Sequence, residues 1–283
     1  MNKLKVCVDL SNVFNDKLFG LYNAYRERTE NLLTENCKRI IGADTLTEQL
    51  LIDSKKQNDF NKLLFANQES KNKLFELAME RGKLWENGKK LKVKFLGGTT
   101  FLQQNVITSA KSWETFANIE FEFVTRGDAE IRVAFISGRG SWSYIGTDAL
   151  NITNQSEPTM NFGWFDDQTT TFEFDRTVIH EFGHCLGCIH EHQSPAASID
   201  WNIPAVYDYY QNTQIPPWDK ATVDRNIFAK YTAGEVTNSN FDNKSIMLYP
   251  IPIDFTNDGF SVGMNNMISK QDSLFISQRY PKP

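Results

Sequence analysis

Histidine and cysteine are scarce in this chain, which has four of each among its 283 residues. Four cysteines are too few for the disulfide framework that holds many small secreted domains together. Cys185 and Cys188 stand three apart in what reads as one helix, which is poor geometry for a disulfide. We therefore expect all the cysteines to be thiols.

The sequence also lacks long apolar runs and an excess of positive charge. No stretch approaches the roughly 18 apolar residues of a membrane-spanning helix, so we expect no transmembrane segment. The net charge of −5 argues against nucleic acid as a partner, because phosphate binding needs a concentrated basic surface. Hydrophobic residues make up 40% of the chain, which suits a globular protein with a buried core. We expect a monomer.

The first ten residues, MNKLKVCVDL, do not read as a signal peptide. Their apolar stretch is too short for a signal-peptide core and is interrupted by Asp9. Either the chain is not exported by that route or a leader is missing from this sequence. We expect a secreted protein whose leader is not visible, and keep an exported effector or a cytoplasmic protein as alternatives.

The chain changes character near Gly82. Before it, residues 21–33 and 55–81 are polar stretches with a thin apolar stripe, typical of helices that pack against another part of the protein and do not form a core of their own. After it, the pattern predicts strands at 92–96, 121–124, 130–136 and 159–164. It predicts helices at 103–117, from about 174 into the histidines, near 223–231 and at 270–280.

All the histidines fall within one segment, HEFGHCLGCIHEH, which covers residues 180–192. His180 and His184 are four apart, so a helix places them on one face, where two imidazoles can bind one zinc ion. Glu181 lies beside them, near enough to hold a water bound to the same metal. The segment therefore predicts a zinc site with a carboxylate next to it.

His190 completes this site only if the chain turns back after His184, because a continuing helix would carry it about 15 Å away from His180. Gly187 can make that turn, since glycine enters the left-handed conformation cheaply at a helix end. Three histidines would leave one coordination position open for water, as a catalytic zinc requires. We expect one zinc ion on His180, His184 and His190, with His192 not a ligand.

Other readings of the segment are weaker. The histidines could be ordinary helix residues, but a pattern with five fixed positions is far more specific than HExxH alone. Cys185 and Cys188 form a C-x-x-C, but no strand–loop–helix context supports a redox site. Both are better read as small buried hydrophobes.

Residues 245–249, SIMLY, resemble the methionine turn of the metzincin zinc peptidases, in the form found in astacins. Glu191 and Asp200 also match astacins, as do the segments 85–96, 140–146 and 269–280. The stretch 84–283 therefore resembles bacterial astacin-like peptidases along its length, and residues 1–83 stand where such enzymes carry a propeptide. The disulfide cysteines of animal astacins have no evident counterparts here.

The resemblance implies an α+β fold, with a metzincin catalytic domain at 84–283 preceded by a mainly helical propeptide at 1–83. The upper subdomain, 84–190, would hold a mixed twisted sheet and the zinc-binding helix. The lower subdomain, 191–283, would be irregular and helical.

The resemblance also implies the roles of single residues. Glu181 would act as general base and then acid, with zinc-bound water as the nucleophile. Tyr249 would stabilise the transition state, Met247 would pack beneath the metal, and Glu191 would meet the mature amino terminus. The strand at 159–164 would pair with an extended substrate as an edge strand, and its residues are Thr159, Met160, Asn161, Phe162 and Gly163.

Latency would need a propeptide group at the open zinc position. The segment 1–83 has no histidine, so the candidates are the carboxylates Asp9 and Asp44 and the thiols Cys7 and Cys37. We favour Cys7, because residues 3–9 are apolar and extended and could lie along the cleft like a substrate. Cys37 is the second choice, since its surroundings are charged.

The sequence therefore predicts a zinc-dependent endopeptidase that acts on proteins or peptides and is activated by another protease. Two alternatives remain: a zinc-stabilised binding module that has lost catalysis, and a zinc hydrolase of another substrate, such as an amidase. A binding module would be expected to lose Glu181 and Tyr249, and both are present.

Overall fold

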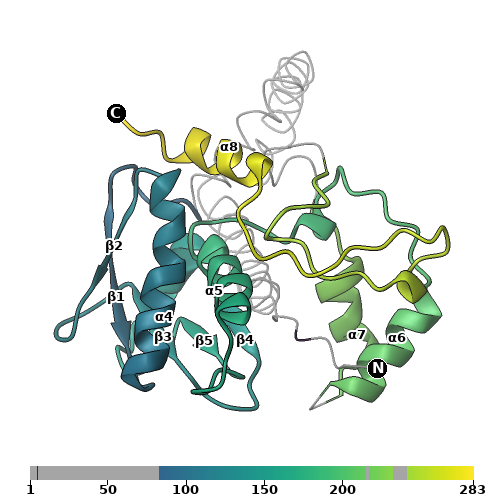
Figure 1. The fold of residues 1–283 in the computed structure, drawn as a ribbon, viewed down its shortest axis with the longest axis horizontal. Helices are drawn as coiled ribbons and strands as arrows, with labels where there is room; N and C mark the ends of the chain where they lie inside the picture. Colours follow the sequence, from purple (N-terminus) through teal and green to yellow (C-terminus); the bar gives the residue numbers. More distant parts are fainter. Residues whose placement is uncertain (1–4, 6–82, 215–216, 232–240) are drawn as a thin grey trace, which may run out of the picture. The chain divides into compact units, whose positions relative to one another are not determined.

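The computed structural model describes residue 5 and residues 83–214, 217–231 and 241–283 (Figure 1). They belong to one compact unit, formed by Met1–Ser11 and Met79–Pro283. The helices predicted at 21–33 and 55–81, and the candidate ligands Cys7, Asp9, Cys37 and Asp44, lie outside the described residues.

The unit is an α+β fold built on a five-stranded mixed sheet in the order β2-β1-β3-β5-β4. Pairing is parallel from β2 through β1 and β3 to β5, and antiparallel between β5 and β4. The strands are β1 (Lys90–Phe95), β2 (Glu120–Phe123), β3 (Ile131–Ala134), β4 (Ser141–Ser143) and β5 (Met160–Phe162).

The sheet order corrects the prediction of an edge strand at Thr159–Gly163. Met160, Asn161 and Phe162 form β5, which pairs with β3 on one side and with β4 on the other. Within the described part of the chain, the edge on this side is β4 instead. Alternating side chains identify a strand, but they carry no information about which strands flank it.

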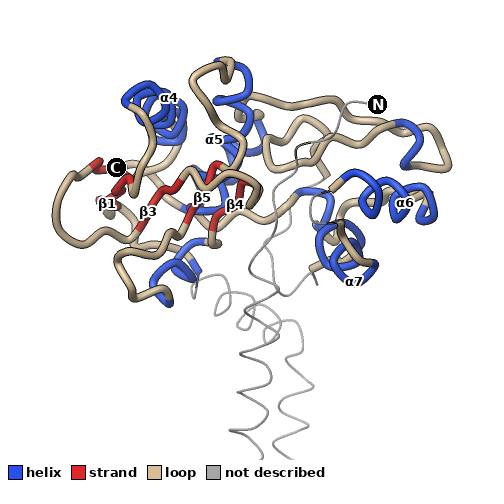
Figure 2. Tube along the Cα trace, turned by 90° about the horizontal axis from the view of Figure 1, so that it is seen from below, coloured by secondary structure: helices blue, strands red, loops and turns tan. Residues whose placement is uncertain are grey.

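Helices α4 (Thr100–Ala110) and α5 (Thr171–Cys185) lie side by side over one face of the sheet (Figures 1 and 2). A 3-10 helix, Lys111–Thr115, extends α4 and carries Trp113, which is fully buried. The Trp113 indole donates from Nε1 to the carbonyl of Ile179, 2.8 Å away. The ring of Phe182 packs edge to face against the ring of Phe121 in β2, with 4.9 Å between the ring centroids. These contacts fix the position of α5 on the sheet.

The rest of the described chain is mainly loops and short helices. It contains α6 (Ile203–Thr213), α7 (Lys220–Val223), a π-helical turn (Asp224–Phe228), a 3-10 turn (Ile253–Phe255) and α8 (Lys270–Arg279). Helix α6 and strand β4 were not predicted. No helix among the described residues is long and apolar enough to cross a membrane.

Two hydrophobic clusters hold these elements. The first lies between the sheet, α4 and α5, and it also takes in Met247 and Ile276 from the later part of the chain. The second lies between α6, α7 and residues 248–255, around Val206, Tyr210 and Leu248. Helix α5 and Met247 therefore share one core.

Candidate active site

Helix α5 carries three residues of the predicted site. Thr170 caps its first turn, where the side-chain oxygen accepts from the backbone N–H of Glu173, as a good N-cap residue does. His180, Glu181 and His184 lie in the second half of the helix, and all three are buried.

Helix α5 ends at Cys185, and Gly187 follows its C-cap residue Leu186. Gly187 has a φ of +98°, a conformation that costs glycine little because it has no Cβ. The N–H of Cys188 donates to the carbonyl of Gly183 at 3.0 Å, and the N–H of Gly187 donates to that of His184 at 2.8 Å. This pair of bonds is a Schellman motif, and it reverses the chain so that His190 returns beside His184.

Hydrogen bonds set the tautomers of the two helical histidines. Nδ1 of His180 lies 2.8 Å from the carbonyl of Ile246, and Nδ1 of His184 lies 2.8 Å from that of Cys188. A carbonyl only accepts, so each Nδ1 carries the ring proton. Because a neutral imidazole has one N–H, Nε2 of each ring presents a lone pair.

His190 has the same tautomer through Gln193. The Gln193 amide donates from Nε2 to the carbonyl of Arg225 at 2.7 Å, which turns its oxygen toward His190. His190 Nδ1 then donates to that oxygen at 3.2 Å and leaves a lone pair on Nε2. Partners of this kind orient metal-binding histidines in proteins. Gln193 was not predicted; its one sequence signal is an amide three residues after a ligand.

The three histidines converge on one point. One ligand atom from each lies within 4.8 Å of the others, and Nε2 of His184 is 3.0 Å from Nε2 of His190. Two lone pairs this close repel unless a cation lies between them, and tetrahedral zinc holds its nitrogens about 3.3 Å apart. Burial, together with the neighbouring imidazoles, holds the pKa of His180 and of His190 well below the usual value. The neutral, convergent rings fit one zinc ion.

His192 is not part of this cluster. Its Nε2 lies 2.9 Å from the carbonyl of Asn226. Its ring packs 4.7 Å from that of Tyr249, measured between centroids. The described contacts of His192 are therefore those of a supporting residue behind the histidine triad.

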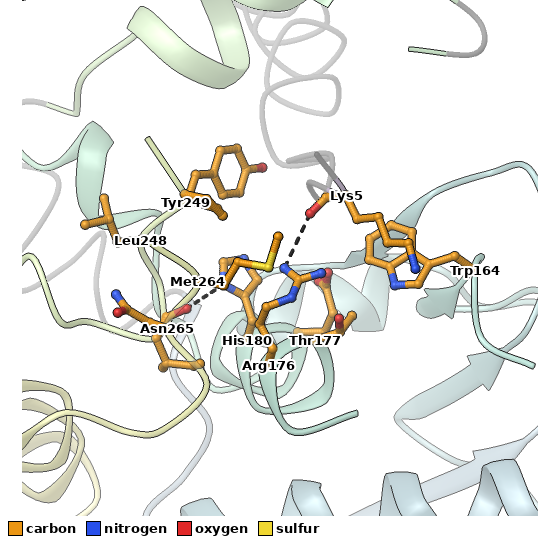
Figure 3. A pocket seen from close by; sticks show the side chains of 12 residues that line it. Lys5, Trp164, Arg176, Thr177, His180, Leu248, Tyr249, Met264 and Asn265 are labelled. Carbon is orange, nitrogen blue, oxygen red and sulfur yellow. Dashed lines mark hydrogen bonds between the residues drawn. The ribbon is translucent and has the colours of Figure 1, made fainter. Parts of the chain in front are cut away.

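Glu181 and His180 line the same pocket. Glu181 is fully buried, and the pocket is also lined by Thr177 and Tyr249 (Figure 3). Tyr249 places its ring 4.3 Å from His190. A carboxylate and a phenol therefore flank the place where the three Nε2 atoms meet.

The segment 245–249 passes beneath α5. Met247 is buried against the helix at Gly183, where a Cβ would lie 2.4 Å from Met247 Sδ. Asp272 holds the turn in place: it accepts from Ser245 Oγ at 2.6 Å and from the N–H of Ile246 at 2.8 Å. Asp272 was not predicted from the sequence. Its signal was the capping box that it forms with Ser269 at the start of α8.

Glu191 lies directly after the third histidine and is half-buried. It accepts from the N–H of Asp242 at 2.9 Å, and burial raises its pKa to about 7. Trp85 donates from Nε1 to the carbonyl of Cys185 at 2.8 Å, which fastens the segment around Trp85 to the end of α5.

Cys185 and Cys188 are both buried and unbridged, as expected. Burial raises the pKa of each thiol well above its usual value. Thiols that stay protonated are poor nucleophiles and poor metal ligands, so these two act as small apolar side chains.

Comparisons with known proteins identify the family of this chain. The family model for the astacin peptidases matches residues 78–280. The solved structure titled "Structure of myroilysin" is 48% identical, with a TM-score of 0.69, over 72% of this chain and 98% of that one. The "Crystal structure of myroilysin" is 46% identical, with a TM-score of 0.56, over 71% of this chain and 86% of that one.

Curated relatives are more distant and much longer. "Protein SpAN" of Strongylocentrotus purpuratus is 30% identical over 157 residues, which are 52% of this chain and 21% of that protein. "Blastula protease 10" of Paracentrotus lividus is 30% identical over 155 residues, 52% of this chain and 22% of that protein. The chain thus spans about a fifth of the length of these relatives.

Proposed function

This chain belongs to the astacin family of peptidases, its histidine cluster is the catalytic zinc site of that family, and on that premise we propose that it is a latent endopeptidase. The observation that carries the proposal is the convergence of three neutral imidazoles beside a buried glutamate. Proteins and peptides are the proposed substrates, and an activating protease is the proposed partner. Action outside the producing cell stays a prediction.

The division of labour at the site follows from the chemistry of its side chains. Zinc, when bound, supplies a Lewis acid that activates water and polarises the scissile carbonyl. Glu181 takes the proton of the attacking water and delivers it to the leaving amine. Tyr249 donates a hydrogen bond to the developing oxyanion, a contribution of a few kcal/mol in other enzymes. Met247 and Gly187 keep the histidines in place.

Substrate binding is assigned to β4 in place of the strand first predicted. An extended peptide adds to a sheet through the unpaired backbone groups of an edge strand. Strand β4, Ser141–Ser143, is the edge of the described sheet, and it contacts α5. A peptide along its outer side would therefore run next to the helix that carries Glu181.

We propose that residues 1–83 are the inhibitory segment and 84–283 the catalytic domain, with subdomains at 84–190 and 191–283. One contact supports an inhibitory role: Lys5 lines the same pocket as His180 and Glu181. Cys7 follows Lys5 by two residues, and a peptide chain covers at most about 7 Å in two residues. This favours Cys7 over Cys37 as the group that takes the open zinc position.

Cleavage of the segment would free a new amino terminus near Trp85, close to the end of α5. Glu191 is the proposed partner of that terminus, because a half-buried carboxylate is stabilised by a nearby cation.

A casein assay tests the proposal. Chain that has been treated with trypsin and then with a serine-protease inhibitor that inactivates the trypsin (the trypsin-treated chain below) should degrade casein, a zinc chelator should abolish the cleavage, and added zinc should restore it. Intact casein in the presence of zinc would favour a binding module. Hydrolysis of small amides without casein cleavage would favour an amidase.

A further inference from the structure

The first turns of α5 carry the charged pair Glu173 and Arg176, and Arg176 lines the active-site pocket together with Trp164. Arg176 donates to Glu173 twice, from Nη2 at 2.7 Å and from Nε at 3.1 Å. The indole of Trp164 donates from Nε1 to the same carboxylate at 2.7 Å. The side chains of Glu173 and Arg176 are only 16% and 11% exposed. These three groups therefore hold one another in fixed orientations.

Lys5 contacts all three groups of this cluster, although 171 positions separate it from Arg176 in the chain. Its ammonium lies 6.0 Å from the centroid of the Trp164 ring and 4.0 Å from Oε1 of Glu173. Its carbonyl accepts from Nη1 of Arg176 at 3.4 Å (Figure 3). Both the side chain and the main chain of Lys5 are thus recognised.

The geometry of the pair explains this double recognition. Because Arg176 uses Nε and Nη2 to hold Glu173, its Nη1 is left to meet a peptide carbonyl. Burial alone would raise the pKa of Glu173, but the hydrogen bond and charge of Arg176 lower it overall. Glu173 is therefore ionised at neutral pH and, with the face of Trp164, attracts a cation.

We propose that Trp164, Glu173 and Arg176 form a specificity subsite for a lysine or arginine side chain of the substrate, and that Lys5 fills it in the latent chain. The inference rests on the proposed function, since it assumes that the pocket binds peptides for cleavage. Arg176 reads the backbone carbonyl of the bound residue, while Trp164 and Glu173 read its charge.

The expected selectivity is modest because the contacts are partly exposed and Arg176 offsets part of the charge of Glu173. A lysine in this subsite should raise kcat/KM by about fivefold over norleucine, its uncharged analogue, which corresponds to about 1 kcal/mol. Glutamate at the same position should lower it.

Peptide cleavage by the trypsin-treated chain tests the selectivity. In quenched-fluorescent peptides, each position on either side of the cleaved bond is in turn lysine, arginine, norleucine or glutamate. One position should prefer the basic residues, and Glu173→Gln should remove that preference or reverse it toward glutamate. Glu120→Gln is the matched control, since Glu120 pairs with Lys90 at 2.8 Å on the far strand β2. A flat profile, or a preference that survives Glu173→Gln, would overturn the proposal.

Amide hydrogen exchange tests the same contact without any catalysis. In the full, uncleaved chain, Lys5→Met and Glu173→Gln should each speed exchange across residues 1–11 by about threefold to tenfold. The double variant should be no faster than the quicker single variant, because both remove one contact. Unchanged exchange in both single variants would refute the subsite. If these variants change exchange as expected but the trypsin-treated wild-type chain does not cleave casein, only the proposed function is refuted.

Discussion

Met247 fills the space that a side chain on Gly183 would need: a Cβ at Gly183 would lie 2.4 Å from Met247 Sδ and 3.1 Å from a ring carbon of Trp113. We predict that Gly183→Ala destabilises the protein. Overpacking a core destabilises a protein by about 1–3 kcal/mol. The higher helix propensity of alanine offsets about 1 kcal/mol of this loss. The net loss of about 1 kcal/mol should lower Tm by about 2–4 °C.

Gly97→Ala provides the control for this measurement, because nothing lies within 4 Å of a Cβ at that position. Its Tm should stay near that of the wild type. A Gly183→Ala protein as stable as the wild type would show that the methionine turn is not packed against α5 as described.

Replacing His190 and His192 in turn distinguishes the zinc ligand from a neighbouring histidine that is not a ligand. His190→Ala should retain much less zinc than the wild type, because the remaining two histidines leave the ion half coordinated. His192→Ala removes an imidazole two residues away whose Nε2 faces the carbonyl of Asn226, and it should still bind one zinc ion. Elemental analysis of the purified proteins gives the comparison. Equal zinc content in both variants would contradict the assignment.

Latency should depend on Cys7. Cys7→Ala chain should cleave casein without trypsin treatment, whereas Cys37→Ala chain should remain latent. A mercurial that modifies thiols should also activate the wild-type chain, because it removes the thiolate that zinc would bind. Activity in Cys37→Ala alone would transfer the role to that residue. Latency in both variants would mean that the block is steric or carboxylate-based.

The mature enzyme should begin between Arg81 and Trp85. Trp85 is already part of the folded body, because its N–H donates to the hydroxyl of Tyr280 at 3.1 Å and its indole binds the end of α5. Cleavage must therefore fall before it, and Arg81 and Lys83 suit a trypsin-like activator. Amino-terminal sequencing of the active form decides the point, and a start within residues 1–60 would refute it.

The sequence predicted the residues of the zinc site better than it predicted the order of the strands in the sheet. His180, His184, Gly187 and His190 act through local geometry, since one helix and one turn bring them together, and spacing alone encodes both. The order of strands depends on contacts between distant segments. Local alternation at 159–164 located β5 but could not reveal that the three residues of β4 would cover its outer edge.

Helix α6 and Asp272 also have signals in the sequence, but these are weaker than those of the zinc site. Helix α6 begins with Asn202 as N-cap and a proline in the first turn, a start signal that was present but not used. Asp272 binds the methionine turn across 26 residues. Its place in a capping box with Ser269 is a start signal for α8 that was not used, and that signal carries no information about the long-range partner, which comes from the packing of α8 against the turn.

The central claim is that Glu181 moves the proton in peptide hydrolysis at a zinc site held by three histidines. Zinc content and casein cleavage should be measured together on trypsin-treated wild-type and Glu181→Ala chains. Because Glu181 is not a ligand, the variant should keep one zinc ion and the wild-type fold while losing cleavage by at least about a hundredfold. Full cleavage by a zinc-loaded Glu181→Ala protein would contradict the account.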